Sequence, residues 1–135
     1  MSDDQEEKAP EEPSGGAEPT EEVDPGPPLI SIDHFAEVVL KTGKVIEAGP
    51  HPNADRLLVM KVDTGEAEPR QIVAGIASDW QPEDLVGRRM IVCCNLKPAK
   101  LRGVESQGMM LAVKGNDRVW PLTVEGDVDP GTRVT

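Results

Sequence analysis

The sequence is poor in aromatic residues, and this limits the ways in which it can bind a partner. Its 135 residues include two tryptophans, one phenylalanine and no tyrosine, and no aromatic residue lies between 81 and 119. Proteins that bind single-stranded nucleic acid usually stack successive bases on aromatic side chains. Stacking along several bases is therefore not expected. Recognition of a nucleic acid through its backbone charge, 2′-hydroxyls and shape fits the sequence better.

Cysteine and histidine are also scarce, which argues against disulfide and metal chemistry. Cys93 and Cys94 are adjacent in a run that is typical of a strand, so their side chains are expected to point to opposite faces. They can neither form an ordinary disulfide with each other nor chelate one ion together. We interpret both as small buried hydrophobic residues. His34 and His51 lie far from them in the sequence, so we predict no zinc site and no other metal.

Long apolar runs and catalytic motifs are missing as well. No apolar stretch approaches the roughly 18 residues of a membrane span, and the N-terminus lacks the basic and apolar regions of a secretory signal. We therefore expect a cytoplasmic protein that does not contact membrane. The phosphate-binding, dinucleotide-binding and zinc-protease motifs are absent. Without a nucleophile triad or paired acids, the sequence predicts neither an enzyme nor a cofactor.

Charge is distributed unevenly between a tail and a domain. Residues 1–28 hold ten carboxylates and one lysine, a net charge of −9, together with six prolines. Such a segment cannot bury enough apolar surface to fold, so residues 1–28 are predicted to be disordered. Residues 29–135 hold fifteen carboxylates against thirteen Lys and Arg, a net charge of only −2. The overall charge of −11 therefore does not exclude a nucleic-acid partner for the domain.

Short apolar runs separated by turn residues predict an all-β domain over 29–135. Expected strands cover 38–48, 57–62, 71–76, 88–95 and 109–113, with one helical turn at 82–87, another near 34–37, and short strands at 119–122 and 132–134. In a regular strand the side chains of Val38 and Val45 would point to opposite faces of the sheet. We therefore expect a bulge at Gly43 to reset the register of the first strand. Five main strands with one short helix between the third and fourth fit a five-stranded OB-fold Greek-key barrel, closed or nearly closed, with short helices and a C-terminal extension.

The most informative stretch runs from Asn95 to Met109, between the last two main strands. It carries three cations within six residues, Lys97, Lys100 and Arg102. Pro98 has no backbone N–H, so this stretch cannot form a full set of ladder hydrogen bonds, and two glycines permit sharp turns. Positive charge together with accessible backbone favours a surface that contacts phosphate and sugar. The alternative is a solvated loop that carries ordinary surface lysines.

Four segments together resemble a known family. They are residues 40–45, 51–57, 71–76 and 95–110. In order and spacing these resemble the tRNA-binding OB-fold domain, which occurs at the C-terminus of many bacterial methionyl-tRNA synthetases, as free-standing dimeric proteins and in the endothelial monocyte-activating polypeptide group. The resemblance covers about residues 33–135. Lys41-Thr42-Gly43 stands where arginine-valine-glycine is more usual, and the acidic tail lies outside it.

The resemblance implies a non-catalytic protein that binds the outer corner of folded tRNA as a homodimer. It is expected to act alone or as an accessory to methionyl-tRNA synthetase. By position the resemblance points to Asn53, Ser106 and Met109, with Lys97, Lys100 and Arg102 where the family is basic. Arg88 and Arg89 could extend this basic patch, although one of the pair could face the other side of its strand. A small export chaperone shares this barrel, so a dimeric peptide-binding chaperone is the alternative function.

Three of these residues have simpler interpretations, which the sequence leaves open. Asn53 is a good turn residue in its own right. Ser106 can cap the end of a strand instead of binding RNA, and Met109 can pack in the core instead of contacting a ligand. His51, between two prolines of a turn, is interpreted as a loop residue without a catalytic role.

Overall fold

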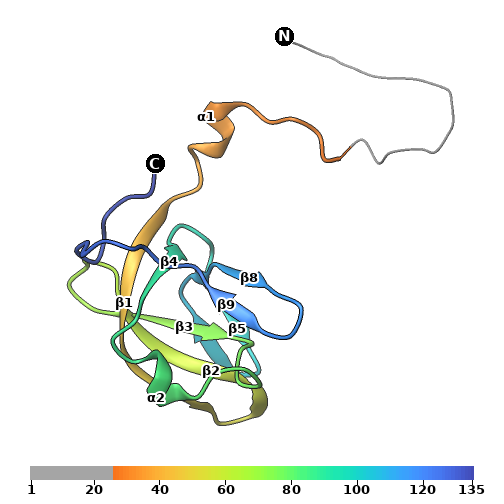
Figure 1. Cartoon of the computed structure of the whole chain (residues 1–135), viewed down its shortest axis with the longest axis vertical. Helices are drawn as coiled ribbons and strands as arrows, with labels where there is room; N and C mark the ends of the chain where they lie inside the picture. The colour runs from red at the N-terminus through yellow and green to blue at the C-terminus, as the bar shows by residue number, and fades with distance from the viewer. Residues whose placement is uncertain (1–25) are drawn as a thin grey trace, which may run out of the picture. The chain divides into compact units, whose positions relative to one another are not determined.

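Antiparallel strands dominate the computed structural model, which describes residues 26–135 (Figure 1). The chain divides after Ser31: residues 26–31 form the described part of a first unit, and Ile32–Thr135 form the second. The second unit begins with the helical turn α1 (Ile32–Phe35) and holds all nine strands of the described residues. The all-β prediction is confirmed. The disorder predicted for 1–28 concerns mainly residues 1–25, which lie outside the described residues.

The first strand, β1 (Leu40–His51), is the longest and pairs with two partners. Its first half pairs with β4 (Arg89–Cys93) and its second half with β2 (Ala54–Asp63), both antiparallel. The bulge expected at Gly43 is wrong: Gly43 pairs in register with Met90, and the shift falls between Val45 and Glu47. Gly43 is needed for another reason, because a Cβ there would lie 2.6 Å from Val62 Cγ1.

Alternating residues of these strands build the core. The side chains of Val45, Met60, Val62, Ile72, Leu85, Met90 and Val92 are fully buried. Leu85 comes from α2 (Pro82–Leu85), the helical turn that the sequence predicts between the third and fourth strands. Proline at the start of this turn and Gly87 just after it, at φ +90°, explain why it is so short. Cys93 and Cys94 are both buried free thiols, as expected.

The main sheet has the strand order of an OB barrel, but its ladder is not closed. The order is β3-β2-β1-β4-β7, where β3 is Arg70–Ala74 and β7 is Met109–Met110. Within the described residues no ladder joins β3 to β7. One backbone bond and two side chains bridge the gap: Gln107 N donates to the carbonyl oxygen of Gln71 (2.7 Å), Val73 N donates to Ser106 Oγ (3.0 Å), and Gln71 N donates to Gln107 Oε1 (2.8 Å). Ser106 and Gln107 therefore connect β3 to the segment before β7 where no regular ladder forms.

Two hairpins form separate two-stranded sheets beside the main one. One consists of β5 (Ala99–Leu101) and β6 (Val104–Ser106), within the stretch expected to be an irregular connection. The other consists of β8 (Ala112–Lys114) and β9 (Val119–Pro121) (Figure 1). The single buried strand expected at 109–113 is therefore wrong. It ends at Met110, and the three residues of β8 are exposed. No helix of the described chain is long and apolar enough to cross a membrane.

Candidate nucleic-acid interface

The β5–β6 hairpin gives the 95–109 stretch a defined shape. Arg102 and Gly103 form its two-residue tip and have φ angles of +54° and +89°. Two successive positive φ values are typical of a type I′ turn, whose twist suits a hairpin. Glycine adopts this conformation freely, whereas an arginine there is uncommon. The chain thus places a long cationic side chain at the outermost point of the hairpin.

The three cations of this stretch face solvent. Lys97 precedes β5, Lys100 lies within it and Arg102 forms the tip; all three are exposed. None of their side chains forms an ion pair or hydrogen bond with another described residue. The structure thus places three solvent-exposed cations in and just before one hairpin, where Lys100 stands opposite Glu105 in the register. Such charges can neutralise phosphates of a nucleic acid and release its counterions.

The turn between β1 and β2 holds the hairpin tip in place. His51 is buried, and its Nε2 lies 2.8 Å from the carbonyl oxygen of Leu101. Because Asn53 N donates to His51 Nδ1 (2.9 Å), Nδ1 is the acceptor, and Nε2 carries the proton donated to Leu101. Asn53 Nδ2 also donates to the carbonyl oxygen of Arg102 (3.2 Å). The structure therefore brings Asn53 and Arg102 together.

Ser106 and Met109 differ sharply in exposure. Ser106 is only 5% exposed; its hydroxyl donates to the carbonyl oxygen of Gly108 (2.9 Å) and accepts the bond from Val73 N. Met109 is 50% exposed, although its neighbour Met110 lies in the core. The structure thus presents the Met109 side chain to solvent and uses the Ser106 hydroxyl inside the protein.

Arg88 and Arg89 are engaged elsewhere. The Arg88 guanidinium lies 4.5 Å from the ring centroid of Trp80. Arg89 Nε donates to the carbonyl oxygen of Val128 (2.9 Å), and its Nη2 forms an ion pair with Asp127. Arg89 is the first residue of β4, whereas the 95–109 stretch follows the end of that strand, roughly 13 Å further along. The structure does not join this pair to the hairpin cations.

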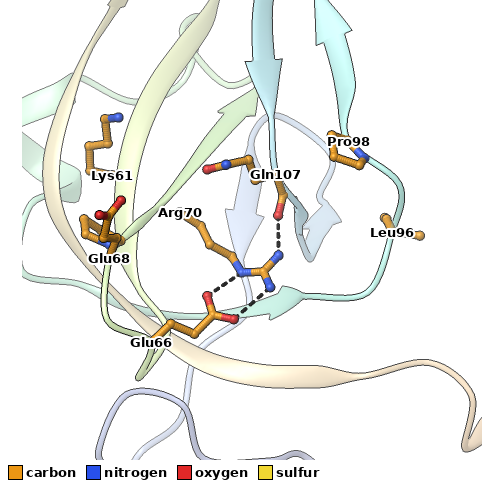
Figure 2. Close-up of a pocket in the computed structure, with 8 residues that line it drawn as sticks. Lys61, Glu66, Glu68, Arg70, Leu96, Pro98 and Gln107 are labelled. Atoms are coloured by element: carbon orange, nitrogen blue, oxygen red, sulfur yellow. Dashed lines mark hydrogen bonds and ion pairs between the residues drawn. The ribbon is translucent and has the colours of Figure 1, made fainter.

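A polar pocket borders the 95–109 stretch. It has a volume of about 430 Å³ and is lined by Lys61, Glu66, Glu68, Pro69, Arg70, Leu96, Pro98 and Gln107. Figure 2 shows the Arg70 guanidinium between Glu66 and Gln107. Arg70 Nε and Nη2 donate to the two carboxylate oxygens of Glu66 at 2.7 and 2.9 Å. Arg70 Nη1 donates to the carbonyl oxygen of Gln107 at 2.6 Å.

These contacts fix the ionisation of the pair. The hydrogen bond from Arg70 lowers the pKa of Glu66 to about 2, although partial burial opposes this shift. The same hydrogen bond raises the pKa of Arg70 above its usual value. Both groups are charged at neutral pH, so the ion pair holds the Arg70 guanidinium in place, and Arg70 in turn donates to the carbonyl oxygen of Gln107.

Sequence reasoning assigned no role in this region to His51, Glu66 or Arg70. His51 and Arg70 have partners 50 and 37 residues away, so no local pattern joins them to the stretch. Glu66 is connected to it only through Arg70, four residues further along the chain. One local signal was available for the hairpin, because Arg102-Gly103 stands between Leu101 and Val104. Among the described residues, no group of His, Cys, Asp or Glu could hold a metal ion. The arrangement is suited to binding, through exposed cations on a rigid support.

Comparisons with known proteins agree with this geometry. Residues 40–133 match a family model described as "Putative tRNA binding domain". The methionine–tRNA ligase of Thermotoga maritima is 52% identical over 106 residues, which cover 78% of this chain but 17% of the ligase. The chain thus spans about a sixth of the length of that relative. The resemblance inferred from the sequence is confirmed.

Solved structures agree as well. A methionyl-tRNA-synthetase-related protein from Pyrococcus horikoshii has a TM-score of 0.74 and 38% identity, and the match covers 80% of this chain and 99% of that one. The chaperone CsaA from Bacillus anthracis has a TM-score of 0.71 and 25% identity over 80% of this chain and 100% of its own. The predicted OB-type architecture is therefore confirmed, with the ladder open between β3 and β7.

Proposed function

The chain belongs to the tRNA-binding domain family, and on this premise we propose that it is a non-catalytic module that binds folded tRNA by its shape. The observation that carries the proposal is the β5–β6 hairpin with the residues just before it, where Lys97, Lys100 and Arg102 are exposed and form no ion pair or hydrogen bond through their side chains among the described residues. A fixed group of exposed cations suits the phosphates of a folded RNA, which keep fixed positions.

The residues of this surface take different roles in the proposal. Lys97, Lys100 and Arg102 neutralise phosphates. Met109 contacts the RNA with its exposed side chain, and Asn53 acts at the hairpin tip, where it already binds the backbone of Arg102. Ser106 acts indirectly, because its buried hydroxyl holds residues 106–108 against β3.

The proposed partners extend beyond tRNA. We infer a homodimer, because apolar side chains outside the barrel are exposed: Ile32 by 79%, Phe35 by 48% and Trp120 by 48%. A symmetric pair is the commonest way to cover such surface. Similarity to methionine–tRNA ligases supports methionyl-tRNA synthetase as a second partner, to which the module would deliver tRNA in the cytoplasm.

A filter-binding titration tests the proposal. Folded tRNA should bind more tightly than single-stranded RNA of equal length, and the affinity should fall steeply between two salt concentrations. Replacing Lys97, Lys100 and Arg102 by alanine should flatten the slope of log affinity against log salt by about 2 to 3 units, at roughly 0.7 to 0.9 per lost phosphate contact.

A double variant, Lys44→Ala/Lys114→Ala, is the matched control, because both lysines are exposed and lie outside the 95–109 stretch. It should keep most of the wild-type slope. A folded triple variant with wild-type affinity and slope would mean that tRNA does not bind at this hairpin.

Similarity to CsaA supports peptide binding as a second candidate function. An unfolded peptide would bind to apolar surface such as that around Trp120 and Val113, which are cross-strand neighbours and half exposed. This binding would tolerate salt because apolar contact releases few ions. A labelled unfolded peptide that binds equally well at low and high salt, in a chain that retains no tRNA, would favour this candidate.

A further inference from the structure

The polar pocket lies beside the proposed path of the RNA. Leu96 and Pro98 both line it, and the exposed Lys97 stands between them in the chain. Lys97 is not itself a lining residue, so a phosphate held by Lys97 would lie outside the pocket, one residue along the chain from its wall. The volume of about 430 Å³ falls within the usual range for small-ligand pockets. One nucleotide attached to that phosphate has the size and position to enter.

The Arg70 guanidinium in the pocket is held in place, but some of its N–H groups have no partner among the described residues. Three of the five N–H groups of Arg70 are taken by Glu66 and Gln107. Two therefore remain for a ligand. Glu66 is also held by the hydroxyl of Thr64, which donates to its Oε1 (2.9 Å). Since Arg70 is fastened on two sides, its free edge keeps a fixed direction, which favours recognition of a planar group.

The walls of the pocket differ in character. Figure 2 shows Lys61 and Glu68 on one side and Leu96 and Pro98 on the other, with the Glu66–Arg70 pair between them. Neither Lys61 nor Glu68 forms an ion pair or side-chain hydrogen bond with any described residue. The pocket thus combines an apolar wall, against which a base can pack, with a free ammonium and a free carboxylate that can bind its polar groups.

We propose that this pocket receives one unpaired nucleotide of the bound tRNA and that it selects guanine. A bare phosphate would be repelled by Glu68, and an apolar ligand would leave four charged groups without water. Guanine matches the free groups: its N1–H and N2 amino group are adjacent donors for a carboxylate, and its O6 and N7 accept from cations. Adenine and cytosine offer a carboxylate only one donating group, and uracil only its N3–H.

This inference depends on the proposed tRNA-binding function, and one substitution separates the two. Glu68→Gln removes a negative charge next to RNA, so a carboxylate that merely faces solvent would make binding tighter or leave it unchanged. A carboxylate that accepts hydrogen bonds from guanine would instead make binding weaker, by about tenfold, the usual effect of losing a hydrogen bond to a charged group. Glu68 is exposed, so the variant should fold normally.

The experiment uses the full chain, a folded methionine tRNA transcript and a glyoxal reagent that modifies N1 and N2 of unpaired guanine. We expect wild-type protein to protect one guanine, and Glu68→Gln to lose both that protection and about tenfold in affinity. Glu83→Gln, at an exposed carboxylate in α2, should behave like wild type.

Two results would overturn the guanine pocket. One is wild-type protein that binds tRNA without protecting any guanine. The other is Glu68→Gln protein that binds tRNA as tightly as wild type with its protection intact. In both cases tRNA binding itself would stand. Wild-type protein that fails to bind tRNA at all would instead contradict the proposed function.

Discussion

Ser106 shows how a side-chain hydroxyl can satisfy a strand N–H that has no backbone partner. It satisfies the backbone N–H of Val73 and donates to the carbonyl oxygen of Gly108, at the seam where the ladder from β3 to β7 is missing. Ser106→Ala would leave a buried N–H without its partner. The free energy of unfolding should therefore fall by about 1 to 3 kcal/mol, measured by urea denaturation.

The neighbouring Glu105→Ala is the control for this prediction, because Glu105 is exposed in the same strand. It should change stability by no more than about 0.5 kcal/mol. A stable Ser106→Ala protein that nevertheless loses tRNA affinity would instead indicate a hydroxyl that contacts RNA directly. That result would support the role that the family resemblance implies for Ser106, a contact with RNA.

At the scale of residues, the sequence predicted charge and position better than contacts. Lys97, Lys100 and Arg102 are exposed as expected, because a polar run with a proline has little chance of being buried. The partners of Ser106 and Arg70 could not be predicted, since they lie 33 and 37 residues away in the chain. Gly43 shows the same limit: its need for a small residue comes from Val62, which only the folded sheet brings close.

The loop between β2 and β3 is held by Glu66 and Arg70, and this contact should be sensitive to acid. The pKa of Glu66 is lowered from 4.5 to about 2, so its stabilising effect is complete above 4.5 and is lost as the pH falls toward 2. Unfolding free energy, measured with urea at about pH 5.5 and about pH 3, should therefore fall more in wild type than in Glu66→Gln.

Glu68→Gln is the control for the acid prediction, because this neighbouring carboxylate has no partner among the described residues. Its stability should depend on pH as in wild type. Equal pH dependence in wild type and Glu66→Gln would show that the ionic contact with Arg70 does not stabilise the fold.

At the scale of elements, period-two patterns located the long strands, and proline with glycine located α2. The β5–β6 hairpin was missed because its strands have only three residues each and are mostly exposed, so no apolar alternation marks them. The run 109–113 was expected to be one buried strand because it is uniformly apolar. It divides because Met110 pairs with β4, whereas Val113 pairs with Trp120 outside the main sheet.

The whole molecule is expected to be a homodimer. Phe35 in α1 is 48% exposed and Val38 is 40% exposed, which leaves apolar surface that a second copy could cover. Sedimentation equilibrium at tens of micromolar protein, roughly the range in which weak dimers still associate, should give twice the chain mass. Phe35→Glu should sediment as a monomer, whereas Glu37→Gln should remain dimeric. A wild-type monomer under these conditions would contradict the prediction.

The acidic segment 1–28 should weaken tRNA binding through its charge. Its net charge of −9 is attached to a domain whose net charge is only −2, so it dominates the electrostatic field that an approaching RNA meets. It can also compete with phosphate for the hairpin cations. Deleting residues 1–28 should therefore strengthen tRNA binding, most clearly at low salt, where the screening length is about 30 Å at 0.01 M against about 10 Å at 0.1 M.

A second variant separates charge from chain length in this prediction. In it, the ten carboxylates of 1–28 are replaced by their amides and the segment keeps its length. If charge is the cause, this variant should bind tRNA as tightly as the deletion, and the difference from wild type should shrink as salt is added. If the deletion alone strengthens binding, the segment obstructs RNA by its bulk. If neither variant differs from wild type at low salt, the segment has no part in tRNA binding, because a charge of this size could not take part without changing the affinity.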